Sequence, residues 1–526
     1  MIRRNSWLLI LLLAGGCEVG PNYKPPQVTV NPAWTESSST EPSDITATTQ
    51  PASVGEWWSN FNDPELNSLV DRAIRNNLDL HNAYSRVVQA REQRGVTGSE
   101  LFPVINADGG YQAARGSSNV TFPLSAFGIT GSPSATPSVA TPNVAHPNVV
   151  HPSDVSVAPI VSPGGPQSPL GDGGIPNADT QIYQAGFDAS WEVDVFGGHR
   201  REIEAADADT AAAIEDHRDV MISLVSELAR DYIELRASQR QSRIAADNLK
   251  DQQDELELTQ SRYKAGFSTD LDVCRESAQV ATTAAILPQL EGSQRQMIHQ
   301  IAILLGQDPD SLTAELSAAQ PIPPAPMDVP VGAPSDLLQR RPDIRRAERE
   351  LAAATARIGA AEADYFPKFS ITGSFGLDSS KAQNLLDWNS RYFAISPGAT
   401  WPIFDAGRIK HNVNVQKSLA AQAATDYQET VLNALREVED ALASCRTEQI
   451  RRKALADAVD ASTAAVAIAR QQYEQGVVDF LQVLDAQRSL LEAQDSLTQS
   501  DSAISTDMVA LYKALGGGWD MSGRKD

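Results

Sequence analysis

The sequence has few of the residues from which disulfide frameworks and metal centres are built. Its 526 residues include only three cysteines and seven histidines. Cys274 and Cys445 fall in segments that we expect to be helical, where we interpret them as small, buried apolar side chains. His146 and His151 lie in a polar, proline-rich segment, and no cysteines or histidines have the spacing of a zinc site. We therefore predict no disulfide framework and no metal ion.

The signatures of the common enzyme classes are also missing. The sequence contains no H-E-x-x-H, no P-loop, no G-x-S-x-G and no cysteine–histidine nucleophile pair. Several very long helical segments also leave little room for a concave active site. We therefore predict that the chain is not an enzyme.

Positive charge is scarce, and so are long apolar runs. Lys and Arg number 43 against 67 Asp and Glu, and the formal charge of −24 argues against nucleic acid as a partner. Beyond the N-terminus, no apolar run is long enough for a transmembrane helix. If the chain crosses a membrane, it must do so with β-strands, because only helices and closed barrels satisfy their backbone groups in lipid.

The N-terminus has the layout of a secretory signal. Arg3 and Arg4 precede a short apolar run, and the stretch LAGGC (13–17) resembles the lipobox of bacterial lipoproteins. We expect cleavage before Cys17, which leaves a mature chain with a charge of about −26. Covalent lipid such as palmitate on Cys17 would anchor the chain to a membrane, and we expect no other cofactor. The alternative is a plain signal peptide that happens to contain a cysteine.

The sequence contains two similar halves. Residues 77–111 align without gaps with residues 341–375 of the stretch 341–376 at an offset of 264, and further on the offset is 210, so that Trp191 corresponds to Trp401. The difference of 54 is an insertion in the first half, within residues 113–180. We expect this segment to be a long loop, because it is rich in Pro, Ser, Gly and Thr and cannot form a core. A repeat of this size predicts two similar structural halves related by pseudosymmetry.

Each half contains two stretches with the alternation of a β-strand. In one of them Tyr183, Phe187 and Trp191 fall on an apolar face. The opposite face is acidic, with Asp188, Glu192 and Asp194. A soluble sheet packed on helices is one interpretation. The aromatic strand ends favour a membrane barrel instead, and the acidic residues then line its water-filled lumen.

The number of strands has a consequence for assembly. Each strand has about a dozen residues, which is enough to cross a bilayer at a tilt. One chain supplies about four strands, whereas membrane barrels begin at about eight. Open edges in lipid would leave backbone groups unpaired, so we predict an obligate oligomer.

Two segments are predicted to be very long helices. From about residue 199 to 263, and again from about 408 to 473, the sequence has neither proline nor glycine. Some 65 residues would form a helix of roughly 100 Å. Apolar residues recur at three- and four-residue steps, which predicts coiling against neighbouring helices. Gly266 and Gly476 are expected to end these helices, and Thr269 or Asp479 to begin the return helices.

Longer motifs occur at four places: CEVGPNYKPP (17–26), WWSNFNDPELNSLVDRAIRNNLDLHNA (57–83), PSDLLQRRPDIRRAERELAAATARIGAAEADYFPKFSITGSFG (334–376) and YEQGVVDFLQVLDAQRSLLEAQ (473–494). They closely resemble the outer-membrane factor family of tripartite efflux systems, of the TolC class, and within it the OprM/NodT-type outer-membrane lipoproteins. The similarity covers nearly the whole mature chain except the segment 113–180.

This resemblance implies a mainly α-helical fold with a membrane β-barrel. A homotrimer would form a 12-stranded barrel in the outer membrane of a Gram-negative bacterium, joined to an α-helical tunnel in the periplasm. It would dock to a periplasmic adaptor (membrane fusion) protein and an inner-membrane, proton-driven pump of the resistance-nodulation-division (RND) type. The chain itself would be a passive exit channel for drugs or other small toxic molecules, as in multidrug resistance. The alternatives are the outer-membrane duct of a type I protein secretion system and a coiled-coil surface lipoprotein without a pore.

The repeat, the loop and the resemblance together predict the following division of the chain. It consists of a signal peptide (1–16), a lipidated N-terminal segment (17–62), a first repeat (63–330) with strands at about 102–113 and 182–196, an extracellular loop at about 114–181 and long helices at about 199–306, a second repeat (331–518) with strands at about 366–377 and 392–404 and long helices at about 406–515, and a C-terminal tail (519–526).

The resemblance also implies where the tunnel closes. In this family a leucine, and an aspartate one turn later, form constricting rings at the helical turns farthest from the membrane. The matching residues are Leu481 and Asp485, which share a helix face. A leucine ring would exclude water, and an aspartate ring would bind cations. Asp272, Arg275 and Arg488 are candidates for ion pairs that hold this gate shut.

Overall fold

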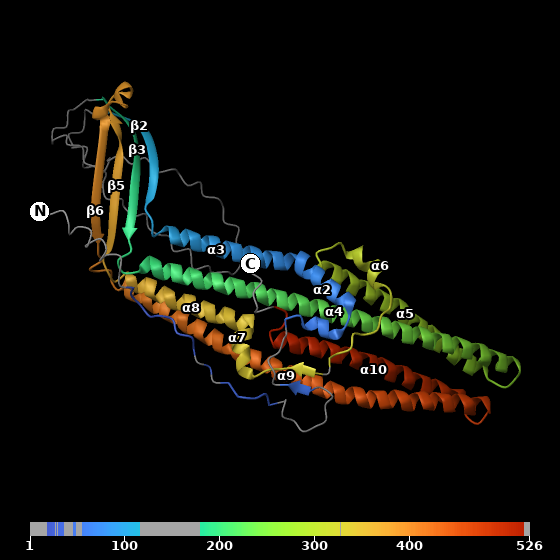
Figure 1. Cartoon of the computed structure of the whole chain (residues 1–526). Helices are drawn as coiled ribbons and strands as arrows, with labels where there is room; N and C mark the ends of the chain where they lie inside the picture. The colour runs from blue at the N-terminus through green and yellow to red at the C-terminus, as the bar shows by residue number, and fades with distance from the viewer. Residues whose placement is uncertain are drawn as a thin grey trace. The chain divides into compact units, whose positions relative to one another are not determined.

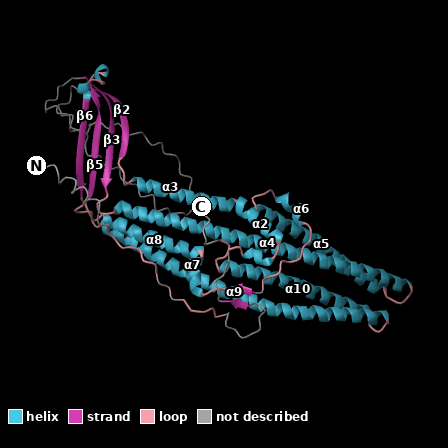
Figure 2. Ribbon diagram, viewed as in Figure 1, coloured by secondary structure: helices cyan, strands magenta, loops and turns pink. Residues whose placement is uncertain are grey.

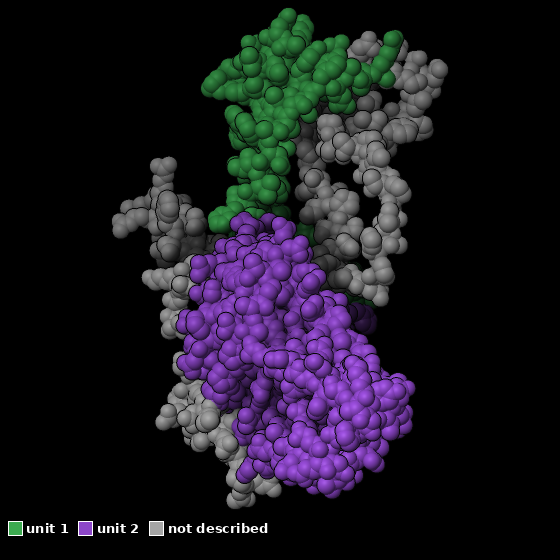
Figure 3. All heavy atoms as spheres, turned by 90° about the vertical axis from the view of Figure 1, so that its right-hand side faces the viewer, with its two compact units in different colours: residues 1–19, 98–200, 362–409 green, residues 20–97, 201–361, 410–526 purple. Residues whose placement is uncertain are grey.

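The computed structural model describes residues 18–26, 28, 30–35, 46–48, 55–115, 179–326 and 328–519. The chain divides into two compact units, which Figure 3 colours separately. We call residues 1–19, 98–200 and 362–409 the strand unit, and residues 20–97, 201–361 and 410–526 the helical unit. The predicted signal peptide and lipidation site, most of the predicted loop and most of the C-terminal tail lie outside the described residues.

The strand unit contains one antiparallel sheet of four strands (Figure 2). Its order is β2 (Val104–Arg115), β3 (Asp179–Val193), β5 (Lys368–Ser379) and β6 (Arg391–Thr400). β2 and β5 are 264 residues apart at both ends, which is the offset seen in the sequence. At the centre of the sheet, β3 of the first half pairs with β5 of the second half, and β2 and β6 form the edges.

The strand boundaries differ from the expected ones for local reasons. β2 and β5 begin two residues later than expected, after Pro103 and Pro367, because proline has no N–H to donate to a ladder. β3 begins and ends three residues earlier than expected. β6 ends at Thr400, shortly before Pro402, and is therefore four residues shorter at its C-terminal end than expected.

The two faces of the sheet differ in character. On one face Phe187, Phe375 and Phe393 lie in one cross-strand row, with Phe187 opposite Phe375 and Phe375 opposite Phe393. These three side chains are 56%, 55% and 79% exposed within the chain. No core in the described part of the chain covers this row, so it is available to an apolar solvent.

On the other face, two glycines make room for a tyrosine. Gly186 and Gly376 are direct partners in the β3–β5 ladder, and Gly376 is also opposite Tyr392. A Cβ added at Gly376 would lie 2.9 Å from the hydroxyl of Tyr392. The missing side chains therefore allow the ring to lie flat across the strands.

The helical unit is built from two hairpins of long helices and their supporting segments (Figure 1). The helices are α2 (Pro64–Asn76), α3 (Leu78–Ser99), α4 (Gly198–Lys264), α5 (Asp270–Leu304), α6 (Thr313–Leu316), α7 (Leu337–Arg340), α8 (Pro342–Ala363), α9 (Arg408–Glu474) and α10 (Phe480–Ala514). α4 and α9 have 67 residues each, and α5 and α10 have 35 each. Both pairs are offset by 210 residues at both ends, so the repeat extends through the helices. None of the described helices combines the length and apolar character that a membrane span requires.

The main core of the helical unit forms where the N-terminal part of the chain packs against the middle of the long helices. Trp57, in the short 3₁₀ helix η2 (Trp57–Phe61), stacks on Tyr512 of α10 with ring centroids 5.3 Å apart. Both rings are fully buried. The core continues through apolar residues of α2, α4, α5, α9 and α10. A small two-stranded parallel sheet, β1 (Thr46–Thr48) with β4 (Asp328–Pro330), belongs to the same unit.

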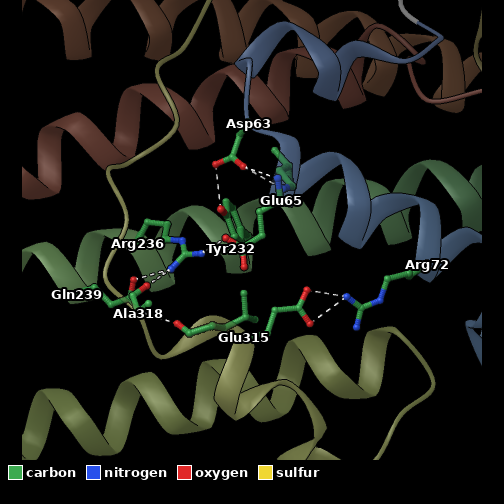
Figure 4. A network of polar contacts seen from close by, with 10 residues as sticks. Asp63, Glu65, Arg72, Tyr232, Arg236, Gln239, Glu315 and Ala318 are labelled. Carbon is green, nitrogen blue, oxygen red and sulfur yellow. Dashed lines mark hydrogen bonds and ion pairs between the residues drawn. The ribbon is translucent and has the colours of Figure 1, made fainter.

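A buried arginine ties three segments of this core together (Figure 4). Arg236 of α4 is fully buried, and its guanidinium donates to Glu65 at 2.7 Å and to the backbone carbonyl of Ala318 at 2.8 Å. It also lies over the ring of Tyr232, whose hydroxyl donates to Asp63 at 2.9 Å. The start of α2 and the segment after α6 are thus both attached to α4.

Candidate functional site

The predicted gate lies where the two long hairpins turn. α4 ends at Lys264, and Gly266 follows with a φ of +81°; α9 ends at Glu474, and Gly476 follows with a φ of +72°. Both glycines therefore adopt the left-handed conformation expected of them. The two turns lie side by side, because the Arg262 guanidinium reaches the carbonyl of Glu474 at 3.4 Å and lies over the ring of Tyr473.

The two return helices begin differently. Thr269 caps α5 as predicted, since its hydroxyl accepts from the Asp272 N–H at 3.2 Å and the Asp272 carboxylate accepts from the Thr269 N–H at 3.1 Å. Asp479 stands at the start of α10, but its side chain makes no capping hydrogen bond. α10 therefore lacks a side-chain cap of this kind at the end that carries the predicted gate.

Leu481 and Asp485 lie on the exposed face of the first turns of α10. Leu481 is 53% exposed although it is apolar. Both residues line a groove of about 640 Å³ between α10 and α9, together with Ser462 and Ala465 of α9. Asp485 forms no ion pair with any described residue of the same chain. The two predicted gate residues are thus accessible and adjacent, as residues that meet copies of themselves in a trimer must be.

Within one chain, Arg488 and Asp272, two of the residues predicted to form ion pairs at the gate, have partners other than Asp485. Arg488 donates to Gln279 of α5 at 2.9 Å. Asp272 is occupied by the capping interaction at the start of α5. Burial tends to raise the pKa of Asp272, but hydrogen bonds from Thr269 and Ser268 and the charge of Arg275 lower it overall below its ordinary value. The structure does not bring any of these three residues to Asp485 within the chain, and their role between chains stays a prediction.

Behind the gate, two consecutive residues of α10 attach this helix to the first hairpin, which is formed by α4 and α5. Gln487 donates to the carboxylate of Glu255 on α4, and Arg488 donates to Gln279 on α5. Arg470 of α9 also reaches Glu255, with 3.4 Å between Nη2 and Oε2. The helix that carries Leu481 and Asp485 is therefore positioned by polar contacts with α4 and α5, and Arg470 of α9 pairs with the same Glu255 that Gln487 contacts.

The interior of this region is polar, which we did not predict. The buried residues recur at helical steps on α4 (Gln252, Glu255 and Thr259) and α5 (Glu276, Gln279 and Thr283). Both triplets have spacings of three and four residues, the pattern of a helix face that packs on a neighbour. That spacing was the available signal, but polar residues at such steps are more often interpreted as a solvated face.

The predicted lumen residues do not all belong to the strand. Asp188 and Glu192 lie in β3, where Asp188 is opposite Asn106 of β2 and Ser374 of β5. Asp194 lies beyond the end of β3, contrary to our expectation. Its carboxylate accepts from the Arg200 backbone N–H at 3.1 Å and forms an ion pair with the Arg200 side chain at 3.2 Å. Asp194 is therefore engaged at the start of α4 and is not a strand residue of the polar face.

Two further predictions concern cysteines and strand ends. Cys445 is buried, as expected, but Cys274 is exposed on α5; neither forms a disulfide. Cys17 lies outside the described residues.

At corresponding places in the two halves, the indole N–H of Trp191 donates to the Leu101 carbonyl and that of Trp401 donates to the Tyr365 carbonyl, both at 2.9 Å.

Comparison with known proteins gives consistent matches along the chain. Residues 161–307 and 333–517 match the family described as outer membrane efflux protein. Outer membrane protein OprJ of Pseudomonas aeruginosa is 31% identical over 525 residues, which cover 98% of this chain and 96% of that protein. The toluene efflux pump outer membrane protein TtgI of Pseudomonas putida is 31% identical over 520 residues, which cover 98% of each chain. The solved structure of the outer-membrane channel OprN matches with a TM-score of 0.78 and 32% identity, and covers 96% of this chain and 100% of that one.

These matches confirm the predicted fold class and location. The chain is mainly helical, and three copies form a 12-stranded β-barrel and an α-helical tunnel, in the outer membrane of a Gram-negative bacterium. The family match covers more than half of the chain, and a solved channel shares its fold along nearly its whole length. This chain therefore belongs to the outer membrane efflux protein family.

Proposed function

We propose that this chain is the exit channel of a three-part efflux pump and that it closes at the Leu481–Asp485 segment. A periplasmic adaptor and an inner-membrane pump of the RND type would deliver drugs or other small toxic molecules to it. The name of the relative TtgI, a toluene efflux pump protein, supports small apolar molecules over exported proteins as cargo. Selection of the cargo would reside in the pump, and this chain would conduct passively.

The edges of the four-stranded sheet support assembly into a trimer. β2 and β6 each pair on only one side within the chain. In lipid their remaining N–H and C=O groups need partners, which a neighbouring copy of the same sheet supplies. The exposed phenylalanine row of Phe187, Phe375 and Phe393 would then face lipid, and the face that carries Asp188 and Glu192 would face the lumen.

The accessibility of the Leu481 and Asp485 side chains carries the proposal of a gate. The Leu481 side chain is 53% exposed within one chain, so it is free to pack against apolar groups of other copies. Three copies around one axis would bring the leucines together into a dry constriction, with a ring of carboxylates one turn away. Like charges in that ring repel one another, so the ring attracts cations, and bound cations would neutralise the carboxylates and keep the constriction narrow.

We further propose that Cys17 carries lipid. The lipobox-like stretch LAGGC supports this, and the acyl chains would add a second attachment to the membrane beside the barrel. The adaptor would contact the helical turns at Gly266 and Gly476, which expose the apolar side chains of Phe267 (78%) and Val477 (68%).

Replacement of Asp485 by alanine tests the gate. The variant is expected to raise the single-channel conductance in planar bilayers by about twofold or more and to weaken block by divalent cations, because the carboxylate ring narrows the pore and binds cations. Asp457→Ala is the matched control, since Asp457 is an exposed aspartate of α9 outside the groove.

The outcomes of this experiment separate the channel from its gate. No conductance from the purified wild-type trimer would contradict the channel itself. Unchanged conductance and unchanged cation block in Asp485→Ala would contradict the gate assignment alone. An equal rise in Asp457→Ala would show that any loss of negative charge has the same effect, which also contradicts it.

A further inference from the structure

A buried carboxyl group without a partner lies directly behind the proposed gate. Glu276 of α5 is fully buried, and neither of its carboxylate oxygens has a hydrogen-bond partner among the described residues. An ionised carboxylate in such a place is costly, because burial removes its water without replacing it. The group therefore requires either a bound cation or a proton when the helices are packed.

The surrounding charges favour the proton. From α4, Glu255 faces Glu276 with a negative charge, and Asp251 lies one turn farther along. From α9, Arg470 faces both glutamates, and it lies 3.4 Å from Glu255 and 3.7 Å from Asp251. The Arg470 guanidinium disfavours any added positive charge, but a metal cation would also need several further oxygen ligands, whereas a proton on Glu276 needs none.

The remaining helix contributes polar groups and no further acid. From α10, Gln487 donates to Glu255, while Arg488 is directed to Gln279. On α5 itself, Asp272 lies about one turn before Glu276 at a partly exposed position, and Arg275 immediately precedes Glu276 at an exposed position. Glu255 and Glu276 are thus two acids in one buried site, and Arg470 is the arginine whose charge acts on both.

We propose that Glu255 and Glu276 form a proton-binding latch, which holds α10 against α4 and α5 when it is protonated and releases α10 when the proton is lost. The latch rests on the proposed gate only in that its effect is transmitted through α10, which carries Leu481 and Asp485. Opening of these helices would bring water to both carboxylates and so remove the cost of their charge.

The direction of the pH effect follows from burial. Burial, and next the negative charge of Glu255, raise the pKa of Glu276 from 4.5 to about 7, although Arg470 opposes the shift. The pKa is therefore higher in the closed, packed state than in an open, hydrated one. Protons favour closure, the favourable contribution is complete below about pH 4.5, and it is lost as the pH rises through about 7.

The test is the open fraction of the purified full-length channel in planar bilayers as a function of pH. From about pH 5 to about pH 8 the ratio of open to closed channels is expected to rise about tenfold or more, since each pKa unit corresponds to a factor of ten. Glu276→Gln, which resembles the protonated form, is expected to stay closed and to lose this pH dependence. Glu257→Gln is the matched control, because Glu257 is exposed on α4.

Two further variants shift the response in opposite directions. Glu255→Gln removes the like charge and is expected to move the midpoint to lower pH. Arg470→Gln removes the opposing charge and is expected to move it to higher pH. If Glu276→Gln does not assemble as a trimer, these two shifts decide the proposal.

Several results would overturn the latch. It is contradicted by a wild-type open fraction that does not change with pH, or by a pH dependence that survives in Glu276→Gln. It is also contradicted if the pH midpoints of Glu255→Gln and Arg470→Gln do not differ. A response of the open fraction to the identity of the cation at fixed pH that persists in Asp485→Ala would show that a cation, and not a proton, fills the site. Because Asp485→Ala is scored by conductance and the latch by open fraction, the gate and the latch can fail separately.

Discussion

Replacement of Phe375 by arginine is expected to reduce the amount of assembled trimer in the outer membrane severalfold. Phe375 lies near the middle of β5 and in the centre of the phenylalanine row, with Phe187 on one side and Phe393 on the other. An arginine on the lipid face of a barrel costs about 2–4 kcal/mol at the midplane of the bilayer. Each trimer would bear this cost three times. The measurement is the fraction of membrane-inserted trimer that resists dissociation by detergent.

The neighbouring residue provides the control for this prediction. Ser374→Arg places the same side chain on the other face of the same strand, opposite Asp188. A charge on the lumen face is solvated, so this variant is expected to assemble normally and to change only the ion preference of the channel. If both variants assembled equally well, or if Ser374→Arg were the more harmful, the assignment of the two faces would be wrong.

Replacement of Arg236 by alanine is expected to lower the free energy of unfolding by about 3–5 kcal/mol, the cost of breaking a buried ion pair by removing one partner. The change leaves Glu65 without its 2.7 Å ion pair and the carbonyl of Ala318 without its donor. Burial raises the pKa of Glu65 and Arg236 opposes this shift, so the carboxylate depends on the arginine for its charge. The measurement is the midpoint of thermal unfolding of the purified trimer, with the free energy taken from chemical denaturation.

Arg72→Ala is the matched control, and Figure 4 shows both arginines. Arg72 also pairs with a glutamate, Glu315, at 2.8 Å, but the two side chains are 28% and 40% exposed. An exposed pair of this kind contributes about 0–1 kcal/mol. Equal losses from the two variants would show that burial does not determine the contribution of Arg236 and would contradict the account of this core.

The architecture could be predicted because the same pattern of residues occurs in both halves of the sequence. The alignment of Phe102-Pro103 with Phe366-Pro367 reappears as two strands that start at equivalent residues, and Gly266 and Gly476 end their helices as expected. Periodicity and special backbone conformations are local properties, so one sequence reveals them. β3, which begins and ends three residues earlier than expected, follows the long insertion, where the repeat gives no guide.

What sequence reasoning missed depends on neighbours that are distant in the chain. Tyr263 and Tyr473 occupy equivalent positions, yet Tyr263 is 44% exposed while Tyr473 is 7% exposed and packs beneath Arg262. Asp194 fits the alternation of the strand, but it lies beyond the end of β3 and forms an ion pair with Arg200. In the sequence, Glu276 cannot be distinguished from a surface glutamate, because its burial depends on helices that are distant in the chain. In each case a tertiary contact overrides the preference of the isolated residue.

The account depends most on one claim, that the sheet separates lipid from water. The most direct measurement is the accessibility of spin labels in the membrane-inserted trimer, attached one at a time at Phe375 and Ser374 after each is replaced by cysteine. We predict that the label at Phe375 collides mainly with oxygen dissolved in lipid and the label at Ser374 mainly with a water-soluble nickel reagent. The reverse pattern, or water-soluble access to both sites, would contradict a transmembrane barrel formed by these strands.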